Sequence, residues 1–507
     1  MIEGDFVRAK KSLKNLIFNV FQQIISIITG FLLPPLLVSN YGSSINGLIS
    51  TVKQIVSYAQ LTGAGIASAS TYVMYKPLAK KNYKKLSGIF NATKDMFIKA
   101  GNIASIVMLM VAFIYPFFVK KDVDVFTTVM LVTMLGACGV SEFYFIGKYQ
   151  ALFSADQKNY LVSIAQGLGN VFNIVISVIL IKFDCNIILV EFGAMSVYIT
   201  RVLFLSIYFK KNYKYIDLKE KSLPNEINQR GDAVIHEITA LVINNSSTIL
   251  ISLFIGLKQA SVFAVYALVF SGLNTICSVV SNGIYASFGD VVAKNEKKVL
   301  SASYNIFECV YTFMIFMIYT VAYIMIMPFI QIYTKNMVDY NYVLPVLGIL
   351  FVLVGITNNI KIPARTLVLA NGNFKETKKY SLIEMIINIV GQLVFMYFFG
   401  IYGALIGCLL AAIYRGVNFI WYTNKFILKE KFNRIIKRIS VCSLLAIIIC
   451  VSSDLLLKIN VDGYLSWFIY AIIVTVIVTI LYTALCYITD KKTFKESVNV
   501  AKKILGK

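Results

Sequence analysis

The sequence predicts an all-α polytopic membrane protein with about fourteen transmembrane helices. Of its 507 residues, 58% are hydrophobic and only 14% are charged, whereas about 25% of the residues of a soluble globular protein are charged. The mean hydropathy is +0.74, and apolar runs of about 18 residues or more recur along the whole chain. Helices of that length cross the hydrocarbon core of a bilayer, so the domain sizes of soluble proteins do not apply here.

Fourteen apolar runs fit helices that cross the bilayer, with boundaries good to about two to four residues. The basic N-terminal stretch MIEGDFVRAKKSLKN precedes the first run and lacks a small-residue cleavage site, so we expect a retained first helix rather than a signal peptide. The predicted spans are 15–38, 45–74, 101–119, 125–147, 160–181, 186–209, 234–256, 259–289, 303–333, 341–370, 380–400, 402–424, 439–457 and 463–488.

The distribution of basic residues predicts the orientation of these spans. The formal net charge is +23, and 37 of the 48 Lys and Arg residues fall in alternate connecting segments, against 6 in the opposite loops. Such a bias marks the cytoplasmic side. We therefore expect a multi-pass protein of the cell (cytoplasmic) membrane with both termini in the cytoplasm. Because the basic residues lie between apolar runs, the net charge does not indicate nucleic-acid binding.

Two arginines inside apolar runs indicate an internal repeat. Arg201 lies in the sixth predicted span, and Arg415 lies at the corresponding place in the twelfth, 214 residues later. A guanidinium at this depth costs several kcal/mol unless it faces protein or water. Because the spacing keeps the orientation of each span, we predict a parallel repeat about an axis along the membrane normal. Four more pairs of similar stretches, at nearly the same offset, contain Ala79 and Ala293, Pro116 and Pro328, Ala155 and Ala370, and Asn173 and Asn388.

The repeat predicts the domain organisation. Residues 1–209 would form an N-terminal lobe of six spans, and residues 234–426 a C-terminal lobe of six spans. The polar segment 210–233 would be a cytoplasmic linker between them. Residues 427–507 would add two spans outside the repeat and a basic cytoplasmic tail.

Five cations within the spans are candidates for binding an anionic substrate. Arg201 and Arg415 are the first of these, and the alternative is that each side chain extends back to the lipid headgroups. Lys361 and Arg365 share a helix face, with Pro363 predicting a kink between them. The fifth candidate is Lys53, in the second predicted span.

Three carboxylates, Glu142, Glu191 and Glu384, are the acids placed most deeply in the predicted spans. Each either pairs with a cation or carries a coupling ion. The single histidine, His236, begins the seventh span, where a capping or interfacial role fits best. The eight cysteines form no CxxC pair or metal-ligand cluster, so we expect no metal and no cofactor. The stretch GALIG at 403–407 predicts close helix packing.

Several long stretches resemble the bacterial polysaccharide flippases of the multidrug/oligosaccharidyl-lipid/polysaccharide superfamily, whose cargo is an O-antigen or capsule repeat unit. They include INGLISTVKQIVSYAQLTGAGIASASTYVMYKPLAKKNYKKL, HEITALVINNSSTILISLFIGLKQASVFAVYALV and IPARTLVLANGNFKETKKYSLIEMIINIV. The resemblance covers about the first 425 residues. The chain departs from the family at Ser247, where a carboxylate is frequent, and at Lys53, where an uncharged residue is expected.

The resemblance implies two lobes around a central cavity that opens alternately to each side of the membrane. The cargo would be an undecaprenyl-pyrophosphate-linked oligosaccharide, with H⁺ or Na⁺ as a possible coupling ion and polysaccharide assembly enzymes as possible partners. The alternatives are a cation-coupled multidrug antiporter of the same superfamily and a lipid II flippase. An enzyme is not expected, because the sequence contains no P-loop, no Ser/His/Asp arrangement and no large outer loop for a catalytic site.

Overall fold

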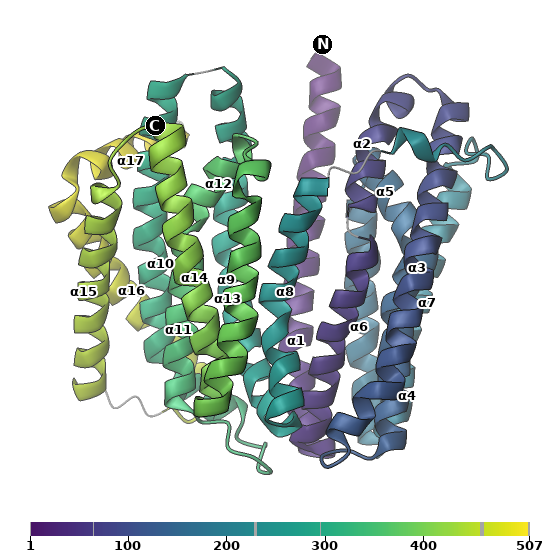
Figure 1. The fold of residues 1–507 in the computed structure, drawn as a ribbon, viewed down its shortest axis with the longest axis horizontal. Coiled ribbons are helices and arrows are strands. Elements are labelled where there is room, and N and C mark those ends of the chain that lie inside the picture. The colour runs from purple at the N-terminus through teal and green to yellow at the C-terminus, as the bar shows by residue number, and fades with distance from the viewer. Residues whose placement is uncertain (1, 64, 228–230, 295, 457–460, 505–507) are drawn as a thin grey trace. The chain divides into compact units, whose positions relative to one another are not determined.

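The computed structural model describes residues 2–63, 65–227, 231–294, 296–456 and 461–504, and these residues form helices and connecting loops without strands (Figure 1). Residues 228–230 of the predicted linker and residue 457 of the thirteenth predicted span lie outside the described residues. The chain divides into two compact units, Met1–Ala264 and Val265–Lys507.

The first unit is built on long helices that run through one apolar core. Buried side chains of α1, α3, α4 and α7 form this core, and a second cluster joins α2, α3, α5, α6 and α7. In chain order the elements are α1 (Ile2–Ala59), η1 (Gln60–Gly63), α2 (Ile66–Ala79), α3 (Tyr83–Val119), α4 (Val125–Ser141), η2 (Glu142–Ile146), α5 (Gly147–Ala155), α6 (Tyr160–Lys182), α7 (Ile187–Asn212), η3 (Pro224–Glu226) and α8 (Gly231–Phe254). Helix α9 (Leu257–Ala293) begins in this unit and continues into the second.

The second unit is organised around α10, which packs against α11, α15 and α16. Its largest core cluster joins α10 to α15 and α16, so the two predicted additional spans are packed onto this helix. The elements are α10 (Lys297–Tyr333), α11 (Pro345–Ile360), α12 (Ile362–Ala370), α13 (Phe374–Phe399), α14 (Ile401–Tyr422), η4 (Thr423–Leu428), α15 (Asn433–Leu456), α16 (Tyr464–Thr489) and α17 (Lys491–Ile504).

Twelve helices in the described part of the chain are long and apolar enough to cross a membrane. One of them, Lys14–Gly63, covers the first predicted span and residues 45–63 of the second. The second predicted span does not continue as one α-helix to residue 74, because η1 follows α1 at Gln60 and α2 begins at Ile66. A shorter apolar helix, Ile238–Phe254, lies at the seventh predicted span. The multi-pass architecture is therefore supported, and the count of fourteen spans stays a prediction.

The two predicted spans 15–38 and 45–74 imply a connecting loop between them. In the structure this connection is a break at one residue within α1. Gly42 has φ 84° and ψ 165°, while the residues on both sides are helical. Glycine adopts this positive φ without the steric cost that a Cβ atom would add. The chain therefore changes direction at a single residue.

The division into compact units differs from the predicted lobes in one respect. It falls at Ala264, within α9, so α8 is grouped with the first unit rather than with the helices that follow it. The predicted boundary in the linker 210–233 and the parallel repeat of the two lobes stay predictions.

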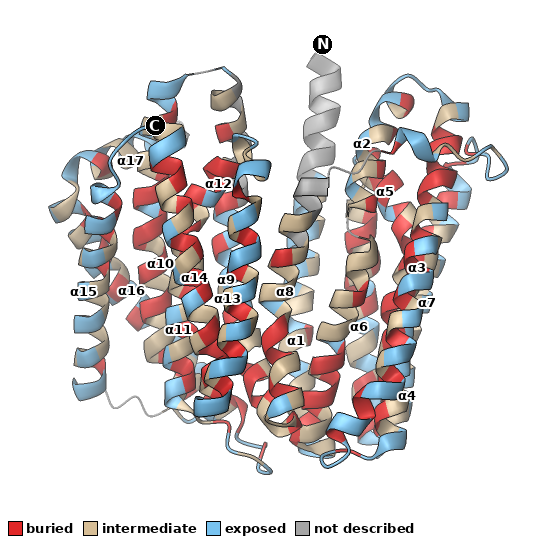
Figure 2. Ribbon diagram, in the orientation of Figure 1, coloured by how far each residue is buried: buried red, intermediate tan, exposed pale blue. Residues whose placement is uncertain are grey.

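Exposed residues occur all along the long helices (pale blue in Figure 2), and many of them are apolar. On α3, Phe113 and Phe117 are 70% and 68% exposed, and on α16, Phe468 and Ile480 are 57% and 61% exposed. Exposed apolar residues in such numbers fit contact with lipid tails. On α16 the buried residues are confined to Val474, Val478, Tyr482 and Cys486, one helical stripe. This pattern is expected of a span that borders lipid on most of its surface.

The predicted topology can be tested with an introduced cysteine. A Lys219→Cys variant in a Cys185→Ser background should resist an impermeant maleimide in intact cells and react after permeabilisation, because residues 210–233 are expected in the cytoplasm. Native Cys185, partly exposed in a predicted outer loop, provides the positive control in the unmodified chain. Labelling of the Lys219→Cys variant in intact cells would reject this orientation.

Candidate functional site

Close packing of α13 and α14 positions the main charged cluster of the second unit. A Cβ atom on Gly403 would lie 2.1 Å from the carbonyl oxygen of Phe395, and one on Gly407 would lie 2.3 Å from the backbone nitrogen of Gln392. Only glycine allows the two backbones to approach so closely, which confirms the packing role predicted for 403–407. The approach brings one face of α13 directly against α14.

Three predicted site residues meet across this packed region. The Lys361 ammonium lies 2.8 Å from Oε1 of Glu384, and Nε of Arg415 lies 3.3 Å from Oε2 of the same carboxylate. Arg415 also donates a 2.7 Å hydrogen bond from Nη2 to the hydroxyl of Ser381. The exposed fractions of Lys361, Glu384 and Arg415 are 9%, 6% and 2%. One carboxylate therefore pairs with two buried cations, and Arg415 is held inside protein rather than extended toward lipid headgroups.

Arg365 is the cation of this cluster that has no partner. The helix is interrupted at Lys361, between α11 and α12, and Pro363 stands in the first turn of α12, which confirms the predicted kink. Arg365, one turn further along, is exposed, and in the described part of the chain its guanidinium makes no hydrogen bond or ion pair. The cluster thus holds three cations and one carboxylate, an excess of two positive charges, and Arg365 is the cation that is both exposed and unpaired.

In the first unit, Arg201 is held by Glu142 and Gln166. Its Nη2 lies 2.9 Å from Oε1 of Glu142 and 3.1 Å from Oε1 of Gln166. The guanidinium carbon lies 5.4 Å from the ring centre of Tyr198. The Nε atom of Arg201 is buried without a hydrogen-bond partner. Glu142 opens the π-helical turn η2, a local irregularity that is common at functional positions.

Arg201 and Arg415 each donate a hydrogen bond to a neutral polar side chain on the preceding helix. Gln166 on α6 and Ser381 on α13 are 215 residues apart and each accepts a hydrogen bond from Nη2 of the arginine on the next helix. The carboxylates differ, because Glu142 comes from η2 and Glu384 from α13. The neutral hydrogen-bond acceptors therefore occupy corresponding positions in the predicted repeat, whereas the carboxylates that pair with the two arginines do not. The prediction that both arginines face one shared cavity stays a prediction.

Lys53 and Glu191 line one pocket inside the first unit. The pocket has a volume of about 280 Å³ and is also lined by Gln60, Asn173 and Ser177. Glu191 is 9% exposed. Among the described residues, neither its carboxylate nor the exposed ammonium of Lys53 has a hydrogen bond or ion pair. Of the three predicted acids, Glu191 is thus the one without a direct cation partner.

Sequence reasoning did not find the neutral anchors Gln166 and Ser381, because single polar residues are common in membrane spans. It also missed Glu308, a carboxylate within the ninth predicted span that is 3% exposed and pairs with Arg438. The signal was present, since Glu308 interrupts an apolar run. Among the described residues, no group of three or more His, Cys, Asp or Glu side chains is arranged to hold a metal ion.

Three solved structures resemble this chain. A lipid II flippase, MurJ, in an inward closed conformation matches with a TM-score of 0.67 and 14% identity, over 93% of this chain and 99% of the flippase. A multidrug resistance MATE family transporter of the MOP superfamily matches in inward-facing and outward-facing conformations, with TM-scores of 0.60 and 0.56 and identities of 15% and 13%. These two matches cover 85% and 86% of this chain and 99% and 96% of the transporter chains. The chain has the fold of these membrane transporters.

This transporter fold agrees with the superfamily resemblance of the sequence. It also supports a multi-pass membrane protein, as the twelve apolar helices do. No protein-family model matches the sequence, and no curated protein matches it either.

Proposed function

We propose that the protein is a flippase that moves an undecaprenyl-pyrophosphate-linked oligosaccharide repeat unit across the cytoplasmic membrane by alternating access. The observation that carries this proposal is the surplus of cations at Lys361, Arg365 and Arg415 over the single carboxylate Glu384. Buried charge is costly in a membrane protein and is retained where it serves a function. A lipid pyrophosphate is the anionic part of the proposed cargo and complements that surplus.

The charged residues also favour this proposal over a multidrug antiporter. A cavity for cationic drugs requires uncompensated carboxylates, whereas Glu142 and Glu384 are paired with internal cations. Glu191, which has no direct partner, shares its pocket with Lys53. A guanidinium such as that of Arg365 offers two parallel N–H donors to a phosphate group. The cation surplus therefore favours an anionic cargo.

A lipid II flippase is the second candidate. The matched flippase structure covers 93% of this chain, whereas the two multidrug transporter structures cover 85% and 86%. The larger coverage favours the architecture of the flippase over that of the multidrug transporters. Lipid II is itself a pyrophosphate-linked saccharide, so the same cations suit both cargoes.

In the proposed mechanism the cations have different tasks. Arg365 contacts the pyrophosphate because it is exposed and unpaired, while Lys361 and Arg415, held by Glu384, supply a positive potential behind it. Arg201 gives the first unit a similar buried cation, compensated by Glu142. Glu191 is the carboxylate best suited to carry a coupling H⁺ or Na⁺, because no cation pairs with it directly.

Replacing Arg365 with glutamine should reduce polysaccharide export by roughly one to two decades. A charge-assisted hydrogen bond contributes about 1.5–3 kcal/mol, and about 1.4 kcal/mol corresponds to a tenfold change in affinity. Arg365→Lys should restore export only in part, because an ammonium keeps the charge without the planar fork. The measurement is complementation of a flippase-deficient strain with variants at matched membrane abundance.

Lys375→Gln is the matched control, because Lys375 is an exposed cation at the start of α13, outside the cluster. It should export as the unmodified protein does. Full export by Arg365→Gln would remove this residue from cargo binding. Complementation of a lipid II flippase defect, with no effect on polysaccharide export, would favour the second candidate.

A further inference from the structure

A second basic pocket lies in the second unit, where three helices begin. Its volume is about 580 Å³, and it is lined by the first turns of α10, α15 and α17. The cations at its wall are Lys297, Lys298, Arg434 and Lys492. None of these four side chains makes an ion pair or hydrogen bond within the described part of the chain.

The positions of these cations are electrostatically unfavourable in the empty pocket. A helix N-terminus carries a partial positive charge, so acidic residues are favoured in the first turn and basic residues are disfavoured. The first turns of α10, α15 and α17 contain no acidic residue. Four cations beside three N-termini break this local rule together, and such breaks are expected where a function requires them.

Three carboxylates also line the pocket, but two of them are already engaged. Glu430 accepts a hydrogen bond from the hydroxyl of Ser301, and Asp490 pairs with Arg438. Glu496 is the third. The Ser301 hydroxyl does not neutralise Glu430, so the four cations face two carboxylates that no cation pairs with, and the pocket keeps a smaller excess of positive charge.

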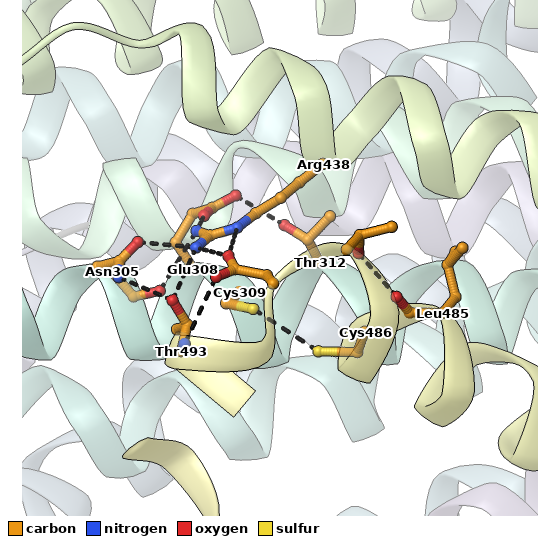
Figure 3. A network of polar contacts seen from close by, with 10 residues as sticks. Asn305, Glu308, Cys309, Thr312, Arg438, Leu485, Cys486 and Thr493 are labelled. Atoms are coloured by element: carbon orange, nitrogen blue, oxygen red, sulfur yellow. Dashed lines mark hydrogen bonds and ion pairs between the residues drawn. The ribbon is translucent and has the colours of Figure 1, made fainter. Parts of the chain in front are cut away.

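A buried polar network fixes the pocket wall. Figure 3 shows Arg438 of α15 surrounded by Glu308 and Asn305 of α10 and by Thr493 of α17. Arg438 also pairs with Asp490, the residue between α16 and α17. The network therefore ties α15, α10 and α17 together next to the cations.

Helix α17 has the pattern of a helix that lies on a membrane surface. Phe494 and Val498 occupy one face, where Phe494 packs on Tyr487 of α16 at 5.7 Å between ring centres and Val498 remains 37% exposed. Lys495 and Lys502 are exposed on the other face. A basic amphipathic helix that directly follows a membrane span favours the interface with anionic lipid.

We propose that the pocket between α10, α15 and α17 binds the headgroup of an anionic phospholipid, with α17 lying along the membrane surface beside it. The phosphate would be held by Lys297, Lys298, Arg434 and Lys492 and by N–H groups in the first turns of α10 and α15, since Asp490 caps α17. This site is separate from the Lys361–Glu384–Arg415 cluster and does not depend on the proposed cargo.

The test uses the full-length protein in a neutral detergent, titrated with phosphatidylglycerol or phosphatidylcholine and followed by native mass spectrometry. Phosphatidylglycerol should bind with a preference over phosphatidylcholine. A Lys297→Gln/Lys298→Gln/Lys492→Gln variant should weaken binding about a hundredfold, at about fivefold for each lysine near a lipid surface. The melting temperature without lipid should not fall, because these side chains are unpaired and electrostatically unfavourable in the empty pocket.

The control is Lys80→Gln/Lys84→Gln/Lys210→Gln, which removes three exposed lysines of the first unit and should bind phosphatidylglycerol normally. Equal binding by the pocket variant and the unmodified protein would overturn the proposal. Inorganic phosphate added at the concentration of the lipid should not displace it. Displacement would identify a site for a soluble anion and would refute a lipid headgroup.

Discussion

Replacing Arg438 with alanine is expected to lower the free energy of unfolding by about 3–5 kcal/mol, the usual cost of removing one partner from a buried ion pair. The variant would leave Glu308, whose side chain is 4% exposed, facing Asp490 without the cation between them. It would also remove the hydrogen bonds from Arg438 to Asn305. Denaturant titration of the purified protein in a mild detergent measures the loss.

Two variants separate the ion pair from a general effect of mutation. Lys437→Ala removes an exposed neighbouring cation and should change stability by no more than about 0.5 kcal/mol. A double variant, Arg438→Met with Glu308→Met, should recover most of the loss, because an apolar pair of similar volume can replace a buried ion pair. If Arg438→Ala unfolds at the same denaturant concentration as Lys437→Ala, the network in Figure 3 contributes nothing to stability.

Asp490 remains charged in this network. Burial alone would raise the pKa of Asp490, but hydrogen bonds from Arg438 and Thr493 outweigh burial and hold the pKa below its ordinary value. A carboxylate with a lowered pKa stabilises the fold above its unfolded-state pKa, and this contribution is lost as the pH falls through the folded-state pKa. The attachment of α17 should therefore persist at neutral pH and weaken in acid.

The sequence predicted the apolar helices and several site residues because a charge inside an apolar run is visible without a structure. The pairing alternative that we considered for the acids is confirmed for Glu142 and Glu384. The packing role of 403–407 is confirmed too, since small residues spaced along a membrane helix have few other uses.

Other features depend on contacts between helices, and no local pattern encodes them. The sharing of Glu384 by Lys361 and Arg415 requires the register of three helices. Arg438 was counted among the basic residues of a cytoplasmic segment, yet its side chain is 4% exposed. Composition places such an arginine near the interface, and only the packing of α10, α15 and α17 shows that it is buried.

Glu384→Gln should destabilise the second unit more than the loss of either cation that Glu384 holds. Glutamine keeps the shape of the side chain and removes its charge, so Lys361 and Arg415 would both be left buried without a counter-ion. We expect a loss of about 3–5 kcal/mol in the free energy of unfolding. Lys361→Met and Arg415→Met should each cost less, because the carboxylate keeps one partner in either variant. Denaturant titration in detergent gives all three values.

Glu376→Gln is the matched control on the same helix, because Glu376 is exposed in the first turn of α13. This substitution should lower the free energy of unfolding by about 0.5 kcal/mol, the contribution of an acidic side chain near a helix N-terminus. The result that tests the proposal is the order of the variants by their free energy of unfolding. If Lys361→Met destabilises the protein as much as Glu384→Gln does, then one carboxylate does not serve two cations. Arg365 would then no longer be the one unpaired cation of the cluster, and the case for it as the contact to an anionic cargo would fail.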